Sequence, residues 1–192
     1  MSAPKILAFA GSLRKASFNK MLVRVAAEGA RGAGGDVQYI DLRDYPMPMF
    51  DEDLEAKHGM DPTARKFKEL MIGADGILLA SPEYNGSVSA VLKNAIDWAS
   101  RPEMGEAPLI AFKDKPIQLM SASPGGLGGI RGLIHLRALL GGIQMMVMPQ
   151  QHCVMQSHKV FDEAGHMNDE KQREAVLGLG KKLVETVNKL RK

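Results

Sequence analysis

The sequence predicts an α/β fold in three layers, in which helices cover both faces of a five-stranded parallel sheet. Strand-like apolar runs alternate with helical patterns along the chain, which is typical of parallel sheets. The 192 residues, of which 45% are hydrophobic, are enough for one core, so we expect one domain over residues 1–192. Five strands with a binding turn after the first fit two doubly wound orders, and the short chain with a single such turn favours the order 2-1-3-4-5.

The strands are predicted from apolar runs, the first of which ends at Ala10. The runs at 77–80 and 145–148 are apolar at every position, so they are expected inside the sheet, where both faces of a strand are covered. The expected strands are, in chain order, 5–10, 36–41, 75–81, 115–121 and 143–148.

The helices are predicted in the segments between these strands and after the last of them, where apolar residues recur at helical spacing. Trp98, at helical spacing with Val91 and Ala95, is interpreted as packing. The last helix is expected to dock on the sheet through one apolar stripe, formed by Ala175, Val176, Leu179, Leu183, Val187 and Leu190. The expected helices are 18–32, 62–73, 88–100, 129–140 and 169–190.

The turn at residues 11–19 carries the strongest functional signal. It joins the first strand to the first helix, and such a connection gathers backbone N–H groups around one point that suits a phosphate. The turn has neither the Gly-x-Gly-x-x-Gly nor the Gly-Lys-Ser/Thr pattern, so it indicates a monophosphate cradle. The cradle would use the hydroxyls of Ser12 and Ser17, the amide of Asn19 and the cation of Arg14. The alternative is a structural connection in which Ser17 or Asn19 only caps the helix.

Two further turns consist mainly of small and polar residues, and the second of them is rich in glycine. They follow the third and fourth strands, at 81–87 and 121–129. In the predicted order the carboxyl ends of strands 1, 3 and 4 meet at one edge, where ligands of such sheets bind. Glycines let the backbone approach a flat ligand closely. A phosphate cradle beside two such loops indicates a phosphorylated heterocycle, and flavin mononucleotide (FMN) has that shape.

Four motifs in the right order resemble the NADPH-dependent FMN reductase family. They are the phosphate turn, Pro-Glu-Tyr-Asn-Gly at 82–86, Leu-Lys-Asn-Ala-Ile-Asp-Trp at 92–98, and the segment 123–129 followed by Arg131. Within the family, the likeness is greatest to bacterial quinone, chromate and azo-dye reductases. The resemblance implies a flavodoxin-like fold, an FMN cofactor, NADPH or NADH as donor, and a homodimer or homotetramer. The chain departs from the family at Ser89-Ala90, where Pro-Gly is common.

The resemblance also implies which residues bind FMN. The phosphate would be held by the first turn, at Ser12, Leu13, Arg14, Ser17, Phe18 and Asn19. The ring would lie on the second turn, at Pro82, Glu83, Tyr84, Asn85 and Gly86. Its other side would face the third turn, at Ser123, Pro124 and Gly125. Hydride transfer through the flavin needs no side-chain acid or base, so no catalytic residue is predicted.

The function that these expectations favour is an oxidoreductase. NADPH or NADH would reduce bound FMN and leave, and a quinone, azo compound, chromate or similar small acceptor would then take its place, which predicts ping-pong kinetics. The alternative is a flavodoxin-like electron carrier without its own NAD(P)H oxidase activity. Carriers of that kind usually have an acidic docking face, whereas this chain has a pI near 9.0. A phosphate-receiver module is excluded, because Gly11-Ser12 and Ser81-Pro82 stand where it needs acidic residues.

Composition limits the remaining classes. The net charge of +3 is modest and spread along the chain, so nucleic-acid binding has little support, although the balance favours small anions. No apolar run approaches the roughly 18 residues that cross a bilayer, so no membrane partner is expected. The single cysteine excludes an internal disulfide, and without the pattern of a signal peptide the protein is expected in the cytoplasm.

Three other features receive structural interpretations. His152, Cys153, His158 and His166 match no zinc spacing, so they are interpreted as loop residues and no metal is expected. The methionines at 145, 146, 148 and 155 are interpreted as core. The proline-containing apolar segment 45–50 is expected to be a loop that covers the flavin of a partner subunit or forms a dimer contact.

Overall fold

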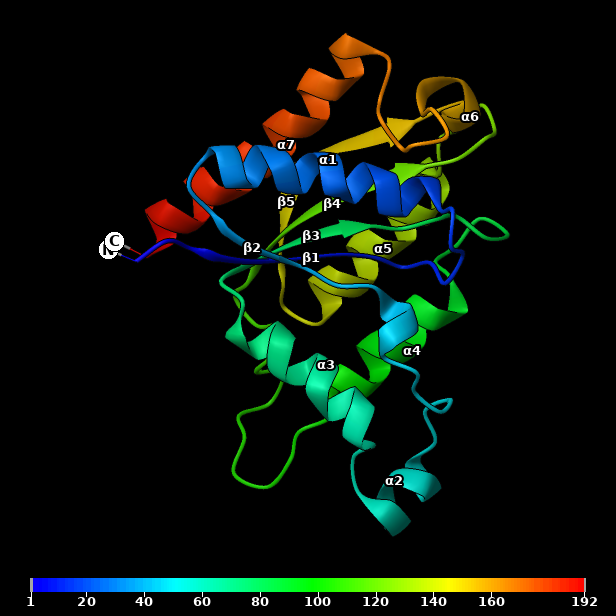
Figure 1. The fold of residues 1–192 in the computed structure, drawn as a ribbon. Helices are drawn as coiled ribbons and strands as arrows, with labels where there is room; N and C mark the ends of the chain where they lie inside the picture. Colours follow the sequence, from blue (N-terminus) through cyan, green and yellow to red (C-terminus); the bar gives the residue numbers. More distant parts are fainter. Residues whose placement is uncertain (1, 192) are drawn as a thin grey trace.

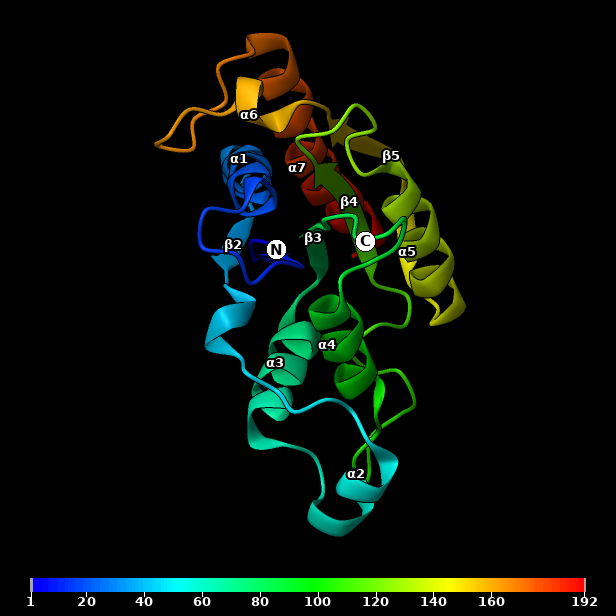
Figure 2. The same cartoon turned by 90° about the vertical axis from the view of Figure 1, so that its right-hand side faces the viewer.

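The computed structural model describes residues 2–191, which form a sheet between two layers of helices (Figures 1 and 2). The sheet is parallel throughout, and its order β2-β1-β3-β4-β5 is the predicted one. The strands are β1 (Lys5–Ala10), β2 (Asp36–Tyr39), β3 (Gly76–Ala80), β4 (Pro116–Ala122) and β5 (Met146–Val154). Parallel strands in this order bring the turns after β1, β3 and β4 to one edge.

Helices cover both faces of the sheet, and each face has its own apolar core. On one face lie α1 (Phe18–Gly32) and α7 (Glu170–Leu190). On the other face lie α3 (Pro62–Gly73), α4 (Ala90–Ser100) and α5 (Ile130–Gly142). Trp98 is buried, as predicted. In α7 the middle of the predicted stripe is buried, whereas Ala175 and Leu190 at its ends are exposed.

The last strand differs from its prediction. The expected range 143–148 begins too early, because α5 ends in a cap at Ile143, and stops too soon, because β5 continues to Val154. β5 is an edge strand and not an inner one, so Met146 is 43% exposed and polar residues are tolerated along it. Because of those polar residues, the apolar pattern of the sequence does not indicate the part of the strand after Met148. Met155 is also exposed, whereas Met145 and Met148 are core as expected.

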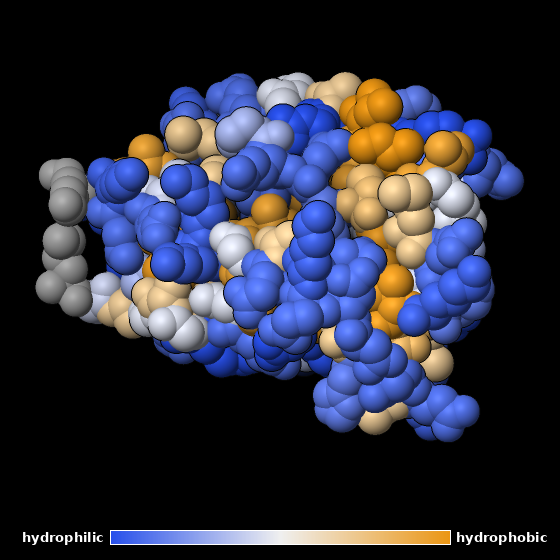
Figure 3. Space-filling model, turned by 90° about the horizontal axis from the view of Figure 1, so that it is seen from above, coloured by the Kyte–Doolittle hydropathy of each residue, from blue (hydrophilic) through white to orange (hydrophobic). Residues whose placement is uncertain are grey.

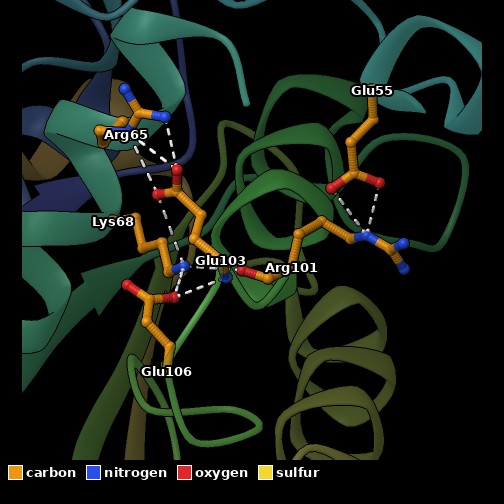
Figure 4. Close-up of polar contacts among 6 residues, drawn as sticks. All are labelled: Glu55, Arg65, Lys68, Arg101, Glu103 and Glu106. Carbon is orange, nitrogen blue, oxygen red and sulfur yellow. Dashed lines mark hydrogen bonds and ion pairs between the residues drawn. The ribbon is translucent and has the colours of Figure 1, made fainter. Parts of the chain in front are cut away.

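Three short helices are not predicted by the sequence: η1 (Leu42–Asp44), α2 (Glu52–His58) and α6 (Ser157–Val160). In α2 no residue is buried, so it shows no apolar periodicity. The Asp51 carboxylate caps it by accepting hydrogen bonds from the backbone N–H groups of Asp53 and Leu54. Its Glu55 binds the guanidinium of Arg101 at the end of α4, with Nε to Oε2 at 2.9 Å (Figure 4). Polar contacts thus replace apolar packing here.

A buried lysine fixes the segment that follows α4 (Figure 4). Lys68 of α3 is 1% exposed, and its Nζ donates to the backbone oxygen of Arg101 at 2.7 Å and to the carboxylate of Glu106. That hydrogen bond holds the pKa of Glu106 below its usual range. Arg65, one turn before Lys68, binds Glu103. The cluster connects α3 to the loop that leads into β4.

Candidate functional site

The three predicted turns meet in one cleft of about 290 Å³ at the carboxyl edge of the sheet. Ten of the predicted residues line it: Ser12, Arg14, Ser17, Phe18, Asn19, Pro82, Glu83, Tyr84, Ser123 and Pro124. Ala122 also lines the cleft and is not predicted by the sequence. Four predicted residues do not line it, namely Leu13, Asn85, Gly86 and Gly125. Figure 3, a view from above α1 and α7, shows a mostly polar surface on which apolar groups gather toward the end where α6 lies.

The first turn presents the open amino end of α1 to the cleft. Ser17 occupies the N-cap position, but its hydroxyl makes no capping hydrogen bond, and the first turn of the helix contains no acidic residue. The backbone N–H groups there therefore keep the positive end of the helix dipole available. The Arg14 guanidinium lies 5.2 Å from the centre of the Phe18 ring. This arrangement of donors and a cation suits an anion such as a phosphate.

The side chain of Asn19 joins the first turn to the third. Its Nδ2 donates to the backbone oxygen of Ala122, and its Oδ1 accepts from the backbone N–H of the same residue, both at 2.9 Å. The side chain is buried, so both bonds are shielded from water. The two residues are 103 positions apart in the chain. Asn19 therefore fixes the start of α1 against the end of β4.

The second turn is a tight hairpin around Asn85-Gly86. Tyr84 and Ser87 exchange backbone hydrogen bonds of 2.9 and 3.0 Å, and the two residues between them have φ angles of 52° and 77°. Two left-handed residues in this position are typical of a type I′ turn, for which Asn-Gly is the preferred pair. Tyr84 is 54% exposed, so its ring is available at the surface of the cleft.

Glu83 connects the second turn to the amino end of α5. Its carboxylate accepts from the backbone N–H groups of Arg131 and Gly132 at 3.0 and 3.2 Å, and from Nε of Arg131 at 2.7 Å. Burial alone would raise the pKa of Glu83, but these hydrogen bonds outweigh it and hold the pKa below its usual range. Glu83 is thus an ionised cap of α5. The side chain of Arg131 is bound to the same carboxylate.

The third turn is held by β5 and α6. The backbone N–H of Ser123 donates to Val154 at 3.0 Å, and the backbone N–H of Ser157 donates to the Ser123 backbone oxygen at the same distance. At the end of the turn, Gly129 has a φ of 90°, and a Cβ atom there would lie 1.9 Å from Oγ of Ser121. Only glycine fits this position. The turn therefore has a fixed shape on one side of the cleft.

Comparison with known proteins identifies the family to which this arrangement belongs. Residues 4–159 match the family model described as NADPH-dependent FMN reductase. The chain belongs to that family. An NADPH:quinone oxidoreductase of Arabidopsis thaliana is 37% identical over 175 residues, which cover 88% of this chain and 85% of that protein. An NAD(P)H-dependent FMN reductase of Pseudomonas aeruginosa is 36% identical over 173 residues, which cover 90% and 89%.

Solved structures agree with this assignment. FerB, a flavoenzyme NAD(P)H:(acceptor) oxidoreductase from Paracoccus denitrificans, superposes with a TM-score of 0.81 at 28% identity and covers 97% of this chain and 98% of its own. A flavodoxin from the domain Archaea superposes with a TM-score of 0.61 at 14% identity, and the matched region covers 96% of this chain and 99% of that one. The second likeness concerns the fold alone, which is flavodoxin-like as predicted.

The departure from the Pro-Gly pattern of FMN reductases forms a specific contact. Ser89 caps α4 by accepting from the backbone N–H of Leu92 at 3.3 Å, and its hydroxyl donates to the backbone oxygen of Gly11 at 2.6 Å. Ser89 is buried. The hydroxyl therefore connects the first turn to the beginning of α4, a connection that proline in its place could not make.

The histidines and the cysteine do not gather at the cleft as a group. Within residues 2–191 no three metal-ligating side chains lie close enough to hold an ion. His152 and Cys153 lie in β5, and His158 lies in α6, so these three are not loop residues, which corrects their interpretation from the sequence. His166 lies in an exposed segment and pairs with Asp162, Nδ1 to Oδ2 at 3.1 Å.

None of the helices in the described part of the chain is apolar over a length that would cross a membrane.

We expect the Cys153 thiol to react slowly in the native protein. Burial, with a smaller contribution from Glu83, raises its pKa from 9.0 to about 11. At pH 8 the native thiol is therefore ionised roughly a hundredfold less than an ordinary thiol, and only the thiolate reacts. Alkylation by iodoacetamide, followed by mass spectrometry, should be at least about tenfold slower in native protein than in urea, and it should accelerate up to pH 11. Equal rates in the two states would contradict the pKa shift.

Proposed function

We propose that this protein binds FMN in the cleft and transfers electrons from NADPH or NADH through it to quinones and similar electron-poor acceptors. The observation that carries the proposal is the convergence of the open amino end of α1 with two shaped turns in one cleft. A phosphate fits the first of these and a planar ring fits between the other two. Membership of the FMN reductase family and the names of the relatives in it support the same function.

Each turn has a proposed part in holding the cofactor. The phosphate would bind at the first turn, to Ser12, Leu13, Arg14, Ser17, Phe18 and Asn19, with Asn19 contributing its backbone N–H because its side chain is engaged with Ala122. The ring would contact Pro82, Glu83, Tyr84, Asn85 and Gly86 on one side and Ser123, Pro124 and Gly125 on the other. Glu83, as the cap of α5, would act through the shape of its turn.

The residues of the cleft would orient the reaction without donating or accepting a proton. Bound FMN supplies the chemistry, since its ring takes up a hydride from the nicotinamide and passes electrons to the acceptor. The turns would hold the ring and leave one face open to both substrates in succession, which gives ping-pong kinetics. Quinones and azo compounds would bind by stacking on the open face, and chromate, a small anion, would also be reduced there.

Anaerobic spectroscopy of the purified protein tests the proposal. The preparation should be yellow, or become so with added FMN, and NADPH should bleach the visible flavin absorbance, which a quinone should restore. A colourless protein that takes up no FMN would refute the proposal. Flavin that is bound but not reduced by NADPH or NADH would instead favour the flavodoxin-like electron carrier.

We further propose that the protein works as a homodimer or homotetramer, with the loop at 45–50 as a contact. The loop is seated on α4, because the Pro48 backbone oxygen accepts from Nδ2 of Asn94 at 2.9 Å and from Nε1 of Trp98 at 2.8 Å. At its tip Met49 is 70% exposed. Light scattering at micromolar concentration tests this proposal, and a monomer would overturn it.

Replacing Arg14 with alanine should weaken FMN binding by about tenfold to a hundredfold. This is the usual effect of losing a hydrogen bond to a charged group. The affinity for riboflavin, which has no phosphate, should stay within about twofold on the same reasoning. Equilibrium dialysis of both ligands checks the result, and equal losses would argue against a phosphate at the first turn.

Replacing Gly125 with valine should lower flavin occupancy while leaving the free energy of unfolding nearly unchanged. A Cβ atom at Gly125 would contact only Oγ of Ser123, at 3.4 Å, so the folded chain has room for a side chain there. A bound ring that lies against Gly125 would overlap with the valine side chain, so the two could not occupy the site together. Flavin content after gel filtration, compared with urea unfolding of the same samples, separates the two effects. Full occupancy would remove Gly125 from the proposed site.

A further inference from the structure

Between β5 and α7 the chain passes over the amino end of α1 (Figure 2, in orange). We call residues 156–168, which include α6, the crossing segment. Its beginning is fixed to the third turn, since the backbone N–H of Ser157 donates to the Ser123 backbone oxygen at 3.0 Å. Further along, Gly165 lies beside α1, where a Cβ atom on it would be 3.2 Å from Cγ of Met21. The crossing segment therefore extends from the third turn of the cleft to the helix that follows the first turn.

The crossing segment has a fixed shape because its two halves bind each other. Phe161 and Met167 form an antiparallel β-bridge. The backbone N–H of Asp162 donates to the His166 backbone oxygen at 3.0 Å, and the Asp162 carboxylate accepts from the His166 backbone N–H at 2.8 Å. Phe161 and Met167 are each 5% exposed and belong to the core between α1 and the sheet. The segment thus holds the Phe161 ring in a buried place.

The Phe161 ring reaches the first turn through one other ring. It stacks on Phe18, the first residue of α1, with 6.0 Å between the ring centres and 25° between the ring planes. Phe18 is half-buried and lines the cleft. The guanidinium of Arg14, which also lines the cleft, lies over the same Phe18 ring. Phe18 is therefore in contact with a buried ring on one hand and with the cation of the first turn on the other.

The Arg14 side chain is exposed, so its order depends on such contacts. Its Nη2 donates to the Ala16 backbone oxygen at 2.6 Å, and the Phe18 ring supports the guanidinium. A free arginine side chain loses much rotamer freedom when it binds a ligand. A guanidinium that is already ordered loses less, so it binds an anion more tightly. Whatever orders Phe18 should therefore strengthen a phosphate contact of Arg14.

We propose that Phe161 is a positioning residue for the phosphate of FMN. By stacking on Phe18 it orders that ring, and the ordered ring holds the Arg14 guanidinium at the cleft. The inference rests on the proposed binding of FMN there. It concerns the phosphate contact alone, whereas the buried amide of Asn19 fixes the start of α1 as a whole.

Phe161→Leu tests the proposal, because it removes the ring and keeps an apolar side chain. Equilibrium dialysis should show FMN binding weakened about fivefold and riboflavin binding changed by less than about twofold. Phe161→Tyr, which keeps the ring, should restore the FMN affinity to within about twofold of the original. Equal losses for the two flavins would overturn the proposal. If Phe161→Leu does not fold, Phe161→Met, which also lacks the ring, must give the same result.

Phe112→Leu is the matched control. Phe112 is fully buried and precedes β4, so it lies at the edge of the sheet opposite the cleft. Both leucine variants remove a buried ring and should lower the midpoint of thermal unfolding. Only Phe161→Leu should change the ratio of the FMN affinity to the riboflavin affinity. A similar change in Phe112→Leu would show that lost stability, and not the position of Arg14, weakens the binding of FMN.

Combination with Arg14→Ala tests whether Phe161 acts through the guanidinium. In protein that already carries Arg14→Ala, the further change Phe161→Leu should alter the FMN affinity by less than about twofold, because the contact that it positions is gone. A second fivefold loss in that protein would show that Phe161 acts independently of Arg14, and the proposal would be wrong.

Proton NMR of the flavin-free protein provides a measurement that needs no cofactor. Side-chain protons of Arg14 that lie over the Phe18 ring should resonate upfield of those of an ordinary arginine. Phe161→Leu should shift them toward ordinary values, and Phe112→Leu should not. Resonances that stay unchanged in Phe161→Leu would overturn the inference whether or not flavin binds. A protein that takes up no FMN but shows the shift would refute the proposed function alone.

Discussion

Replacing Asn19 with alanine should lower the affinities for FMN and for riboflavin by the same factor, about tenfold. The change removes two buried hydrogen bonds to Ala122, each worth about 1 kcal/mol. These bonds hold the start of α1 at a fixed distance from the end of β4, and a flavin that spans both needs that distance. Part of the lost energy should therefore appear as weaker binding, whether or not the ligand carries a phosphate.

The comparison of the two flavins separates positioning from direct contact. If the Asn19 side chain bound the phosphate, only the affinity for FMN would fall, as predicted for Arg14→Ala. Equilibrium dialysis of both ligands against each variant gives the ratio of the FMN affinity to the riboflavin affinity, which is compared with the ratio for the original protein. An unchanged ratio for Asn19→Ala, together with a smaller ratio for Arg14→Ala, supports the positioning role. Thermal unfolding of the flavin-free protein should also show a lower midpoint for Asn19→Ala.

The contact of Asn19 marks the limit of what the sequence predicts. The meeting of the three turns could be predicted, because parallel strands bring their carboxyl ends to one edge and local residue types reveal each turn. The partner of Asn19 could not, because Ala122 lies 103 positions away and contributes only backbone atoms. The same holds for Glu83, whose role as a cap of α5 depends on how that helix lies in space.

Errors in the predicted elements have a related physical cause. Apolar periodicity reports burial, so it finds β3 and α7 and misses elements that are stabilised in other ways. α2 has no buried residue and depends on its Asp51 cap and on Glu55. β5 lies at the edge, where one side of the strand is open and polar residues carry no penalty. The sequence pattern consequently truncated the strand where its polarity changes, after Met148.

Replacing Gly129 with alanine should lower the free energy of unfolding by about 3 kcal/mol and abolish flavin binding. The residue has a φ of 90°, which costs an L-amino acid about 1–2 kcal/mol. Its new Cβ would also lie 1.9 Å from Oγ of Ser121, which donates to the Ser81 backbone oxygen at 2.7 Å. Relieving this clash must move the end of β4 or break that bond, and either change distorts the cleft.

Gly126, in the same turn, provides the matched control for stability. A Cβ atom there would meet nothing within 4 Å, and its φ is not positive, so Gly126→Ala should unfold at the same urea concentration as the original protein or slightly higher. The two variants add the same methyl group three residues apart, and only the backbone geometry of the site distinguishes them. Similar losses of stability would show that any side chain disrupts this turn, and the specific shape assigned to Gly129 would then be wrong.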